Sequence, residues 1–187
     1  MSLSYHNGSL VPSADLQLPL SDLGFMMGVT ISERLRTFAG QLFRLEQHVE
    51  RLRQSLEMVG FETLETMEQL TATAEELARE NHQLLDPDDD LGMYILVTPG
   101  LASGSSQRPT VIIGTAPLEF SSWNTTYREG TELVTSSHRQ VPASSWHPHL
   151  KCRSRMHYFL ADQEAERRQP GARALLLDQQ QKVGEAT

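Results

Sequence analysis

The stretch that decides the fold is Val29–Gly60, "VTISERLRTFAGQLFRLEQHVERLRQSLEMVG". Its first half alternates apolar and polar residues in the manner of two strands, with Ala39-Gly40 at the turn between them. From Leu45 the apolar residues step by four and three, which predicts an amphipathic helix ended by Gly60. The positions in this apolar stripe are Leu45, Val49, Leu52, Leu56 and Val59. Strands followed directly by a helix predict an α+β arrangement.

The flanking segments extend this pattern on both sides. Asn7-Gly8 predicts a tight hairpin near the N-terminus, because both residues tolerate a positive φ. A second helix is predicted after Thr66, which forms a capping box with Gln69. The segments "LGMYILVTPG" and "TVIIGTAPL" are predicted strands. Residues 1–120 are therefore expected to form a small α+β N-terminal domain.

The chain changes character around "EFSSWNTTYREG", residues 119–130. Beyond it, "TELVTSSHRQV" and "ARALLLD" are predicted strands, and the helix between them is stopped by Pro170-Gly171. This order predicts that residues 121–187 form the first part of a mixed α/β domain.

Composition narrows the classes of function. A hydrophobic content of 39%, a charged content of 21% and a formal charge of −8 describe a globular protein with an acidic surface. Such a surface argues against nucleic acid and anionic membranes as partners. No apolar run has the length of a membrane span, and the single cysteine, Cys152, fits a reducing compartment. We therefore expect a cytoplasmic protein.

The chain has fourteen arginines but only two lysines, Lys151 and Lys182. An amine differs from a guanidinium because it can lose its proton and act as a nucleophile towards an aldehyde. Arg153 and Arg155 follow Lys151, and their positive charges favour the uncharged amine. Lys182 lies in "DQQQKVGE", which has the composition of an exposed turn. Lys151 is thus a candidate catalytic residue, although a surface lysine at a helix start is the simpler interpretation.

Two further residues complete a possible cofactor site. Arg51 lies on the predicted first helix, and Glu185 follows the last strand and turn. A lysine, an acid and an arginine are what pyridoxal phosphate requires: an amine for its aldehyde, an anion for its pyridinium nitrogen and a cation for its phosphate. Arg51 can equally form an exposed ion pair on its helix, and Glu185 can be an ordinary surface acid.

The order and setting of these residues resemble a known family. The segments "HNGSLVP", "DLGFMMGVTISERLRTFAGQLFRLEQHVERLRQSLEMVG", "YILVTPG" and "KCRSRMHYFLADQEAERRQPGARALLLDQQQKVGEAT" are similar to class IV pyridoxal-phosphate enzymes. That family includes branched-chain aminotransferases, D-amino acid aminotransferase and 4-amino-4-deoxychorismate lyase. The resemblance implies the fold type IV architecture of these enzymes, an α+β domain followed by a mixed α/β cofactor domain.

The resemblance also implies roles for individual residues. Lys151 would attach covalently to the cofactor and carry a proton during the reaction. Glu185 would pair with the pyridine nitrogen, and Arg51 would bind the phosphate. Arg36 and Tyr94 fall at positions that lie near the substrate pocket in the aminotransferases.

Several positions depart from the family pattern. Ser154-Arg155 replaces the Asn-Tyr pair that many aminotransferases carry after the lysine, and an arginine there resembles the lyase branch. Glu33, in contrast, resembles the aminotransferase branch. Leu96 replaces an arginine of the branched-chain enzymes, and Pro99 interrupts a "T-R-G" pattern. The chain also stops two residues after Glu185, where relatives continue. The resemblance therefore implies an incomplete cofactor domain.

Three functions remain open on these grounds. The first is an aminotransferase that acts on a small amino acid and a 2-oxo acid, the second is a lyase that releases pyruvate, and the third is a non-catalytic remnant. The family resemblance also implies a homodimer. His147 and His149 could share a strand face and begin a metal site, but no third ligand is suitably spaced, so we expect no metal. Cys152 and the apolar residues Phe25, Met26, Met27, Phe38 and Phe43 are expected to pack in the core.

Overall fold

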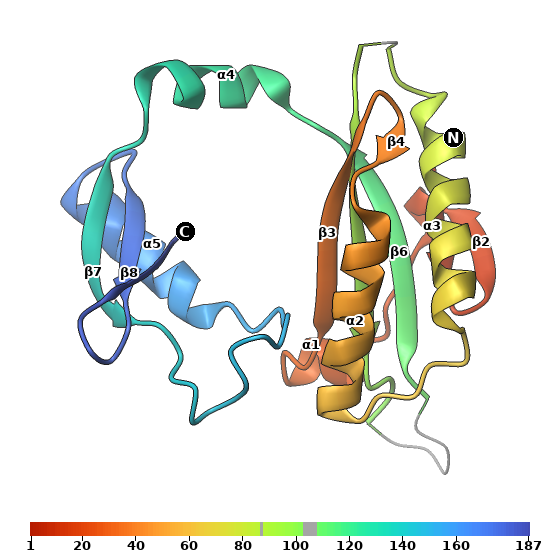
Figure 1. Ribbon diagram of the computed structural model, residues 1–187, viewed down its shortest axis with the longest axis horizontal. Coiled ribbons are helices and arrows are strands. Elements are labelled where there is room, and N and C mark those ends of the chain that lie inside the picture. Colours follow the sequence, from red (N-terminus) through yellow and green to blue (C-terminus); the bar gives the residue numbers. More distant parts are fainter. Residues whose placement is uncertain (87, 103–107) are drawn as a thin grey trace. The chain divides into compact units, whose positions relative to one another are not determined.

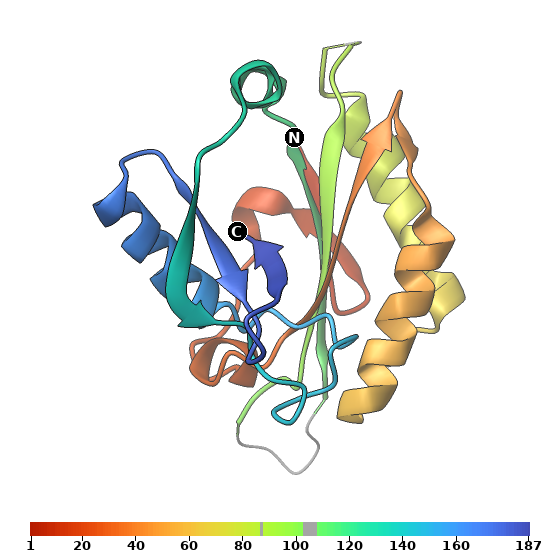
Figure 2. The ribbon, with the colours of Figure 1, turned by 60° about the vertical axis from the view of Figure 1, so that its left-hand side comes forward.

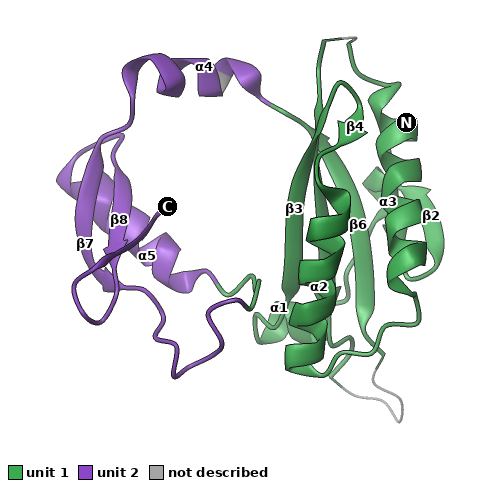
Figure 3. Ribbon diagram, in the orientation of Figure 1, with its two compact units in different colours: residues 1–118, 150–154 green, residues 119–149, 155–187 purple. Residues whose placement is uncertain are grey.

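The computed structural model describes residues 1–86, 88–102 and 108–187 (Figure 1). The chain divides into two compact units, coloured in Figure 3. Unit 1 comprises Met1–Leu118 and Leu150–Ser154, and unit 2 comprises Glu119–His149 and Arg155–Thr187. The sequence placed every residue after 120 in the second domain, whereas Leu150–Ser154 packs with unit 1. The domain boundary of the full-length protein stays a prediction.

Unit 1 is built on a six-stranded sheet with the strand order β2-β1-β6-β5-β3-β4. All neighbouring strands are antiparallel. The strands are β1 (Leu3–His6), β2 (Ser9–Pro12), β3 (Ile31–Phe38), β4 (Gln41–Leu42), β5 (Leu91–Thr98) and β6 (Thr110–Pro117). Because β4 pairs with only the last two residues of β3, the first part of β3 has an edge that another segment can pair with.

Both predicted hairpin turns are confirmed. Asn7 and Gly8, between β1 and β2, have φ values of 47° and 91°. Ala39 and Gly40, between β3 and β4, have φ values of 50° and 75°. Two successive positive φ values are typical of the turn that matches the twist of a two-residue hairpin.

Two helices cover one face of this sheet, as Figure 2 shows. They are α2 (Leu45–Val59) and α3 (Met67–His82). The predicted ends are confirmed, since Gly60 caps α2 at a φ of 72° and Thr66 begins α3 with a reciprocal capping box. The core between sheet and helices contains Ile31, Leu35, Leu45, Val49, Leu52, Leu56, Leu70, Ala74, Leu77, Met93, Ile95 and Val97.

Five apolar residues that we expected in the core are instead exposed. The exposed fractions are 66%, 60% and 69% for Phe25, Met26 and Met27, and 50% for both Phe38 and Phe43. The first three lie in and beside the short helix α1 (Leu23–Met26), which follows the 3-10 turn η1 (Ser13–Asp15). The other two contact each other edge to face at the β3–β4 hairpin. Apolar character alone therefore misled the core assignment, because it does not reveal whether another element covers a side chain.

Unit 2 contains a three-stranded sheet of order β7-β8-β9. Strands β7 (Leu133–Arg139) and β8 (Arg173–Leu177) are parallel, and β9 (Val183–Ala186) pairs antiparallel with β8. Helix α5 (Met156–Arg168) lies in the chain between β7 and β8, as a parallel connection requires. A small core of Ala161, Ala165, Ala174 and Leu176 joins helix and sheet. The predicted fold class, α+β followed by part of a mixed α/β domain, is confirmed.

Helix α4 (Phe120–Glu129) was not predicted. Its sequence is rich in serine, threonine and asparagine, which are weak helix formers, and its N-cap Glu119 makes no side-chain capping bond. None of the helices in the described part of the chain is both long and apolar enough to cross a membrane.

Candidate functional site

The segment around Lys151 forms an additional edge on the sheet of unit 1. Cys152 makes an antiparallel bridge with Ile31, at the start of β3. The N–H of Ser32 donates to the carbonyl of Lys151 at 2.9 Å, and the N–H of Arg153 donates to the carbonyl of Thr30 at 2.8 Å. These bonds satisfy the backbone at the open edge of β3 and fix the position of Lys151.

The two neighbours of Lys151 in the chain pack against unit 1. Leu150 and Cys152 pack against the core on the helix side of the sheet. Lys151 is the central residue of a three-residue turn, because the N–H of Cys152 donates to the carbonyl of Leu150 at 3.0 Å. Its backbone N–H also donates to Oγ of Ser55 on α2 at 3.3 Å, which ties the segment to that helix.

Arg36 and Tyr94 lie on the sheet face that points away from the two helices. Even-numbered residues of β3 and β5 point away from the core that Leu35, Met93 and Ile95 form, and Arg34 is the cross-strand partner of Tyr94. The guanidinium of Arg36 lies 4.1 Å from the ring centre of Phe38. Tyr94 lies over Gly114 on β6, where a Cβ would come within 2.2 Å of its hydroxyl oxygen.

Arg51 lies on α2, on the helix side of the sheet, where it binds Glu33 of β3. Its Nε donates to Oε1 of Glu33 at 2.7 Å and its Nη2 donates to Oε2 at 2.5 Å. His48 Nδ1 lies 2.8 Å from Oε2 of the same carboxylate. Ser55, which binds the backbone of Lys151, is one helical turn beyond Arg51. Arg51 and Ser55, the residue that binds the backbone of Lys151, thus lie on the same side of α2.

Glu185 lies in unit 2, on β9 opposite Leu176 of β8. Its Oε2 accepts a short hydrogen bond from the hydroxyl of Tyr158 on α5 and lies 3.5 Å from Nε2 of Gln140. The amide of Gln140 also donates to the Tyr158 hydroxyl at 3.2 Å. The guanidinium of Arg155 stacks 4.0 Å from the centre of the Tyr158 ring. Glu185 is exposed but held in one direction by these side chains.

The structure therefore places Arg36 and Tyr94 on one face of the unit 1 sheet and binds the backbone of Lys151 at the β3 edge, beside the helix α2 that carries Arg51. Glu185 belongs to unit 2 with its own set of contacts. The roles predicted for these five residues stay predictions. Sequence reasoning missed residues that contact them, including Asp90, which lies 3.6 Å from Arg36, and His48, Ser55, Gln140 and Tyr158. A histidine and a serine three residues before and four residues after Arg51 share its helix face, and this spacing could have identified them.

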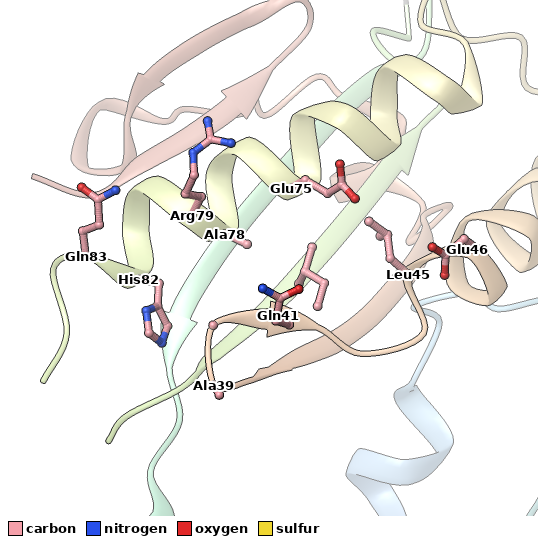
Figure 4. Close-up of a pocket in the computed structure, with 11 residues that line it drawn as sticks. Ala39, Gln41, Leu45, Glu46, Glu75, Ala78, Arg79, His82 and Gln83 are labelled. Atoms are coloured by element: carbon pink, nitrogen blue, oxygen red, sulfur yellow. The ribbon is translucent and has the colours of Figure 1, made fainter. Parts of the chain in front are cut away.

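A cavity of about 580 Å³ lies elsewhere in unit 1 (Figure 4). It is lined by Glu75 and His82 of α3 on one side and by Ala39, Gln41 and Leu45 on the other. None of the predicted site residues lines it. Its lining contains no amine, and the Nε2 of His82 already contacts the carbonyl of Asp89 at 3.1 Å. We therefore place the candidate site at the β3 edge rather than in this cavity.

The two histidines considered as metal ligands, His147 and His149, contact each other edge to face with ring centres 5.1 Å apart. The N–H of His149 donates to Nδ1 of His147 at 3.2 Å, which occupies that ring nitrogen. In the part of the chain that the structure describes, no group of three or more His, Cys, Asp or Glu side chains is arranged to hold a metal ion.

Known proteins share both the sequence and the fold. D-Alanine aminotransferase of Staphylococcus epidermidis is 29% identical over 130 residues, which cover 69% of this chain and 44% of that enzyme. D-Alanine aminotransferase of Bacillus licheniformis is 28% identical over 118 residues, 60% of this chain and 40% of the enzyme. The chain thus spans less than half the length of these relatives.

Solved structures cover the chain almost completely. The T.th. branched-chain amino acid aminotransferase with pyridoxamine 5'-phosphate superposes with a TM-score of 0.83 at 25% identity, over 99% of this chain and 61% of that one. The branched-chain aminotransferase of Escherichia coli, 18% identical, gives a TM-score of 0.83 over 99% of this chain and 62% of its own. The family model described as amino-transferase class IV matches residues 30–187. The chain belongs to the class IV aminotransferase family.

Proposed function

We propose that the full-length protein uses pyridoxal phosphate to transfer an amino group between a small amino acid and a 2-oxo acid. The observation that carries this proposal is the position of Lys151. Its backbone is bound at the β3 edge and to Ser55 of α2, the helix that also carries Arg51. Arg36 and Tyr94 belong to the same sheet, and a cation and a phenol suit a substrate that carries a carboxylate.

The residues present fit the cofactor chemically. Lys151 offers a primary amine, and its ammonium makes no hydrogen bond or ion pair with a described residue. Arg51 offers a planar guanidinium for the phosphate. Glu185 accepts the hydrogen bonds of Tyr158 and Gln140 on Oε2, so Oε1 is available to a protonated ring nitrogen. When bound, pyridoxal phosphate supplies the aldehyde that reacts with an amine and the ring that accepts electrons from the substrate carbon.

Each residue has a distinct task in this proposal. Lys151 would hold the cofactor until the substrate amine replaces it, and its free amine would then be the base that removes the proton from the α-carbon of the substrate. Glu185 keeps a proton on the ring nitrogen, and Arg51 binds the phosphate. Arg36 and Tyr94 orient the substrate carboxylate. The family membership and the relatives named above support amino transfer, and the relatives act on D-alanine and on branched-chain amino acids according to their names.

The proposal includes a homodimer and a cytoplasmic location. The exposed apolar side chains of Phe25, Met26 and Met27 support an interface between two copies, because a monomer seldom leaves such a cluster in water. The single cysteine supports a reducing compartment. The predicted absence of nucleic-acid and membrane partners follows from the acidic charge and stays a prediction.

The decisive experiment adds pyridoxal phosphate to the full-length protein and records the absorbance band of the lysine-bound cofactor. We expect the band in the unmodified protein and in Lys182→Ala, and its loss in Lys151→Ala, because only Lys151 is placed at the site. Lys182 is the matched control, since it is the one other lysine and lies in an exposed turn. Absence of the band in the unmodified protein would support the non-catalytic remnant instead.

A second experiment distinguishes amino transfer from the lyase reaction. Amino transfer to 2-oxoglutarate from small amino acids is expected, whereas pyruvate release from aminodeoxychorismate would indicate the lyase. Arg155, the residue that resembles the lyase branch, stacks on Tyr158 in this structure. A product assay with both substrates decides between the two enzymes.

A further inference from the structure

Glu33 is the most deeply buried charged group beside the candidate site. It lies on β3 and its side chain is 0% exposed. Arg51 supplies two hydrogen bonds to its two oxygens, and His48 supplies a third contact at 2.8 Å. A buried carboxylate needs such partners, because its removal from water is costly. Both oxygens of this buried side chain are therefore bound by residues of α2.

These contacts determine the protonation states of Glu33 and Arg51. Burial acts to raise the pKa of Glu33, but the hydrogen bonds from Arg51 and His48 outweigh it and hold the pKa below its ordinary value. The hydrogen bond with Glu33 raises the pKa of Arg51. Glu33 is consequently an anion, and Arg51 a cation, throughout the neutral range.

The geometry leaves part of Arg51 available to a ligand. The bidentate contact uses the edge of the guanidinium formed by Nε and Nη2. Nη1 makes no hydrogen bond with any described residue, and the Arg51 side chain is 45% exposed. Because a guanidinium is planar and rigid, gripping one edge fixes the direction of the other. Arg53, two residues along the same helix, instead distributes both ends of its guanidinium between Glu50 and Glu57 on the surface.

We infer that Glu33 is a positioning residue that orients Arg51 towards the phosphate of the cofactor. This inference rests on the proposed function, in which Arg51 binds that phosphate. Glu33 does not contact the anion itself; a carboxylate next to a phosphate would repel it, and Arg51 lies between the two. His48 holds the second oxygen of Glu33, so that the carboxylate cannot rotate with the arginine.

The test compares two ligands that differ only in the phosphate. Binding of pyridoxal phosphate and of pyridoxal to the full-length protein is measured by fluorescence titration, and the ratio of the two affinities reports the phosphate contact. Glu33→Gln keeps the shape of the side chain but removes the charge that grips Arg51. We expect this ratio to fall by about tenfold or more, because hydrogen bonds to charged groups contribute on this scale, while pyridoxal binding stays within about twofold.

Two further variants make the result specific. Glu50→Gln disrupts the exposed pair with Arg53 on the same helix and should leave the ratio unchanged. Arg51→Lys should lower the ratio directly, and Glu33→Gln should then add almost nothing, because Glu33 acts through Arg51. Circular dichroism and the melting temperature of each variant are recorded in parallel. If Glu33→Gln does not fold, Glu33→Asp withdraws the carboxylate by one methylene, and the same fall in the ratio is expected.

The outcomes separate this inference from the proposed function. If the unmodified protein binds neither ligand, the proposed function fails, and the inference fails with it. If Arg51→Lys lowers the ratio but the folded Glu33 variants keep it, only the inference is overturned. Equal weakening of both ligands by Glu33→Gln would show a purely structural ion pair and would also overturn it.

Discussion

At the scale of single residues, Glu185 depends on its neighbours for direction. It lies on an exposed strand, yet Tyr158 and Gln140 both bind Oε2 of its carboxylate. The same contacts act on Tyr158. Burial raises the pKa of Tyr158 above its ordinary value of 10.0, and the hydrogen bond to Glu185 raises it further. The phenol therefore keeps its proton into more alkaline solution than a tyrosine in water.

The change Glu185→Gln should lower the pKa of Tyr158, because the anion that opposes phenolate formation is gone. The measurement is the phenolate absorbance of the protein minus that of its Tyr158→Phe variant across an alkaline titration. Since the folded-state pKa is raised, the stabilisation from Tyr158 is complete below about pH 10 and is lost as the pH rises through the folded-state value. Glu164→Gln on the same helix, which binds Ser136 and Ser137, is the control. An unchanged titration in Glu185→Gln would contradict the assigned contact.

The sequence singled out Lys151, Arg51 and Glu185 as candidates by residue type, and the family resemblance implied their roles, which stay predictions. It did not identify Tyr158 or Gln140, because both contact Glu185 only in the folded chain. Tyr158 is 27 positions from Glu185 in the sequence, and Gln140 is 45 positions from it. No local pattern encodes such contacts. Tyr158, which contacts Glu185, lies inside α5, three residues beyond the departure at Ser154-Arg155.

At the scale of elements, local signals predicted most boundaries. The hairpin turns and the ends of α2 and α3 could be predicted from the sequence. Glycine and asparagine tolerate the positive φ of a tight turn, and threonine caps a helix with its side-chain oxygen. Helix α4 could not be predicted, because its residues have low helix propensity and its N-cap residue makes no side-chain capping bond. The exposed apolar residues of α1 and of the β3–β4 hairpin were misassigned because a hydrophobic residue does not reveal whether another element covers it.

The capping box of α3 provides a test at this scale. Thr66→Ala removes the side-chain acceptor for the N–H of Gln69 and should lower the free energy of unfolding by about 1 kcal/mol. Thr66→Ser should retain the bond and the stability. Thr71→Ala, inside the same helix, removes only a bond to the carbonyl of Met67 and should cost little, because alanine favours the helix. Urea unfolding measures all three; equal losses in Thr66→Ala and Thr71→Ala would contradict a specific capping role.

At the scale of the whole molecule, each unit has a core of its own. Leu52 is fully buried in the core of unit 1, and Leu176 is fully buried in the core of unit 2. The two cores share no residue. The sequence predicted two parts of different character, but it could not predict that Leu150–Ser154 returns to unit 1, because pairing across about 120 residues leaves no local signature.

Because each unit has its own core, we expect a core substitution in one unit to leave the stability of the other unit unchanged. Leu52→Ala should destabilise unit 1 by about 2–5 kcal/mol, because it removes buried methyl groups and leaves a cavity. Hydrogen exchange followed by mass spectrometry should show faster exchange in peptides of unit 1 and little change in unit 2. Leu176→Ala is the matched change and should show the reverse pattern. Uniformly faster exchange along the chain in both variants would mean that the units unfold as one.

The edge segment at Leu150–Ser154 has a practical consequence for gene fragments. A fragment ending at Leu118 would contain every named strand of unit 1 but would lack the residues that satisfy the carbonyl of Thr30 and the N–H of Ser32. Its sheet would then present unpaired backbone groups to any neighbouring copy, which is how strands join into aggregates. Fragment libraries of this protein should therefore yield insoluble material until the cut lies beyond Ser154.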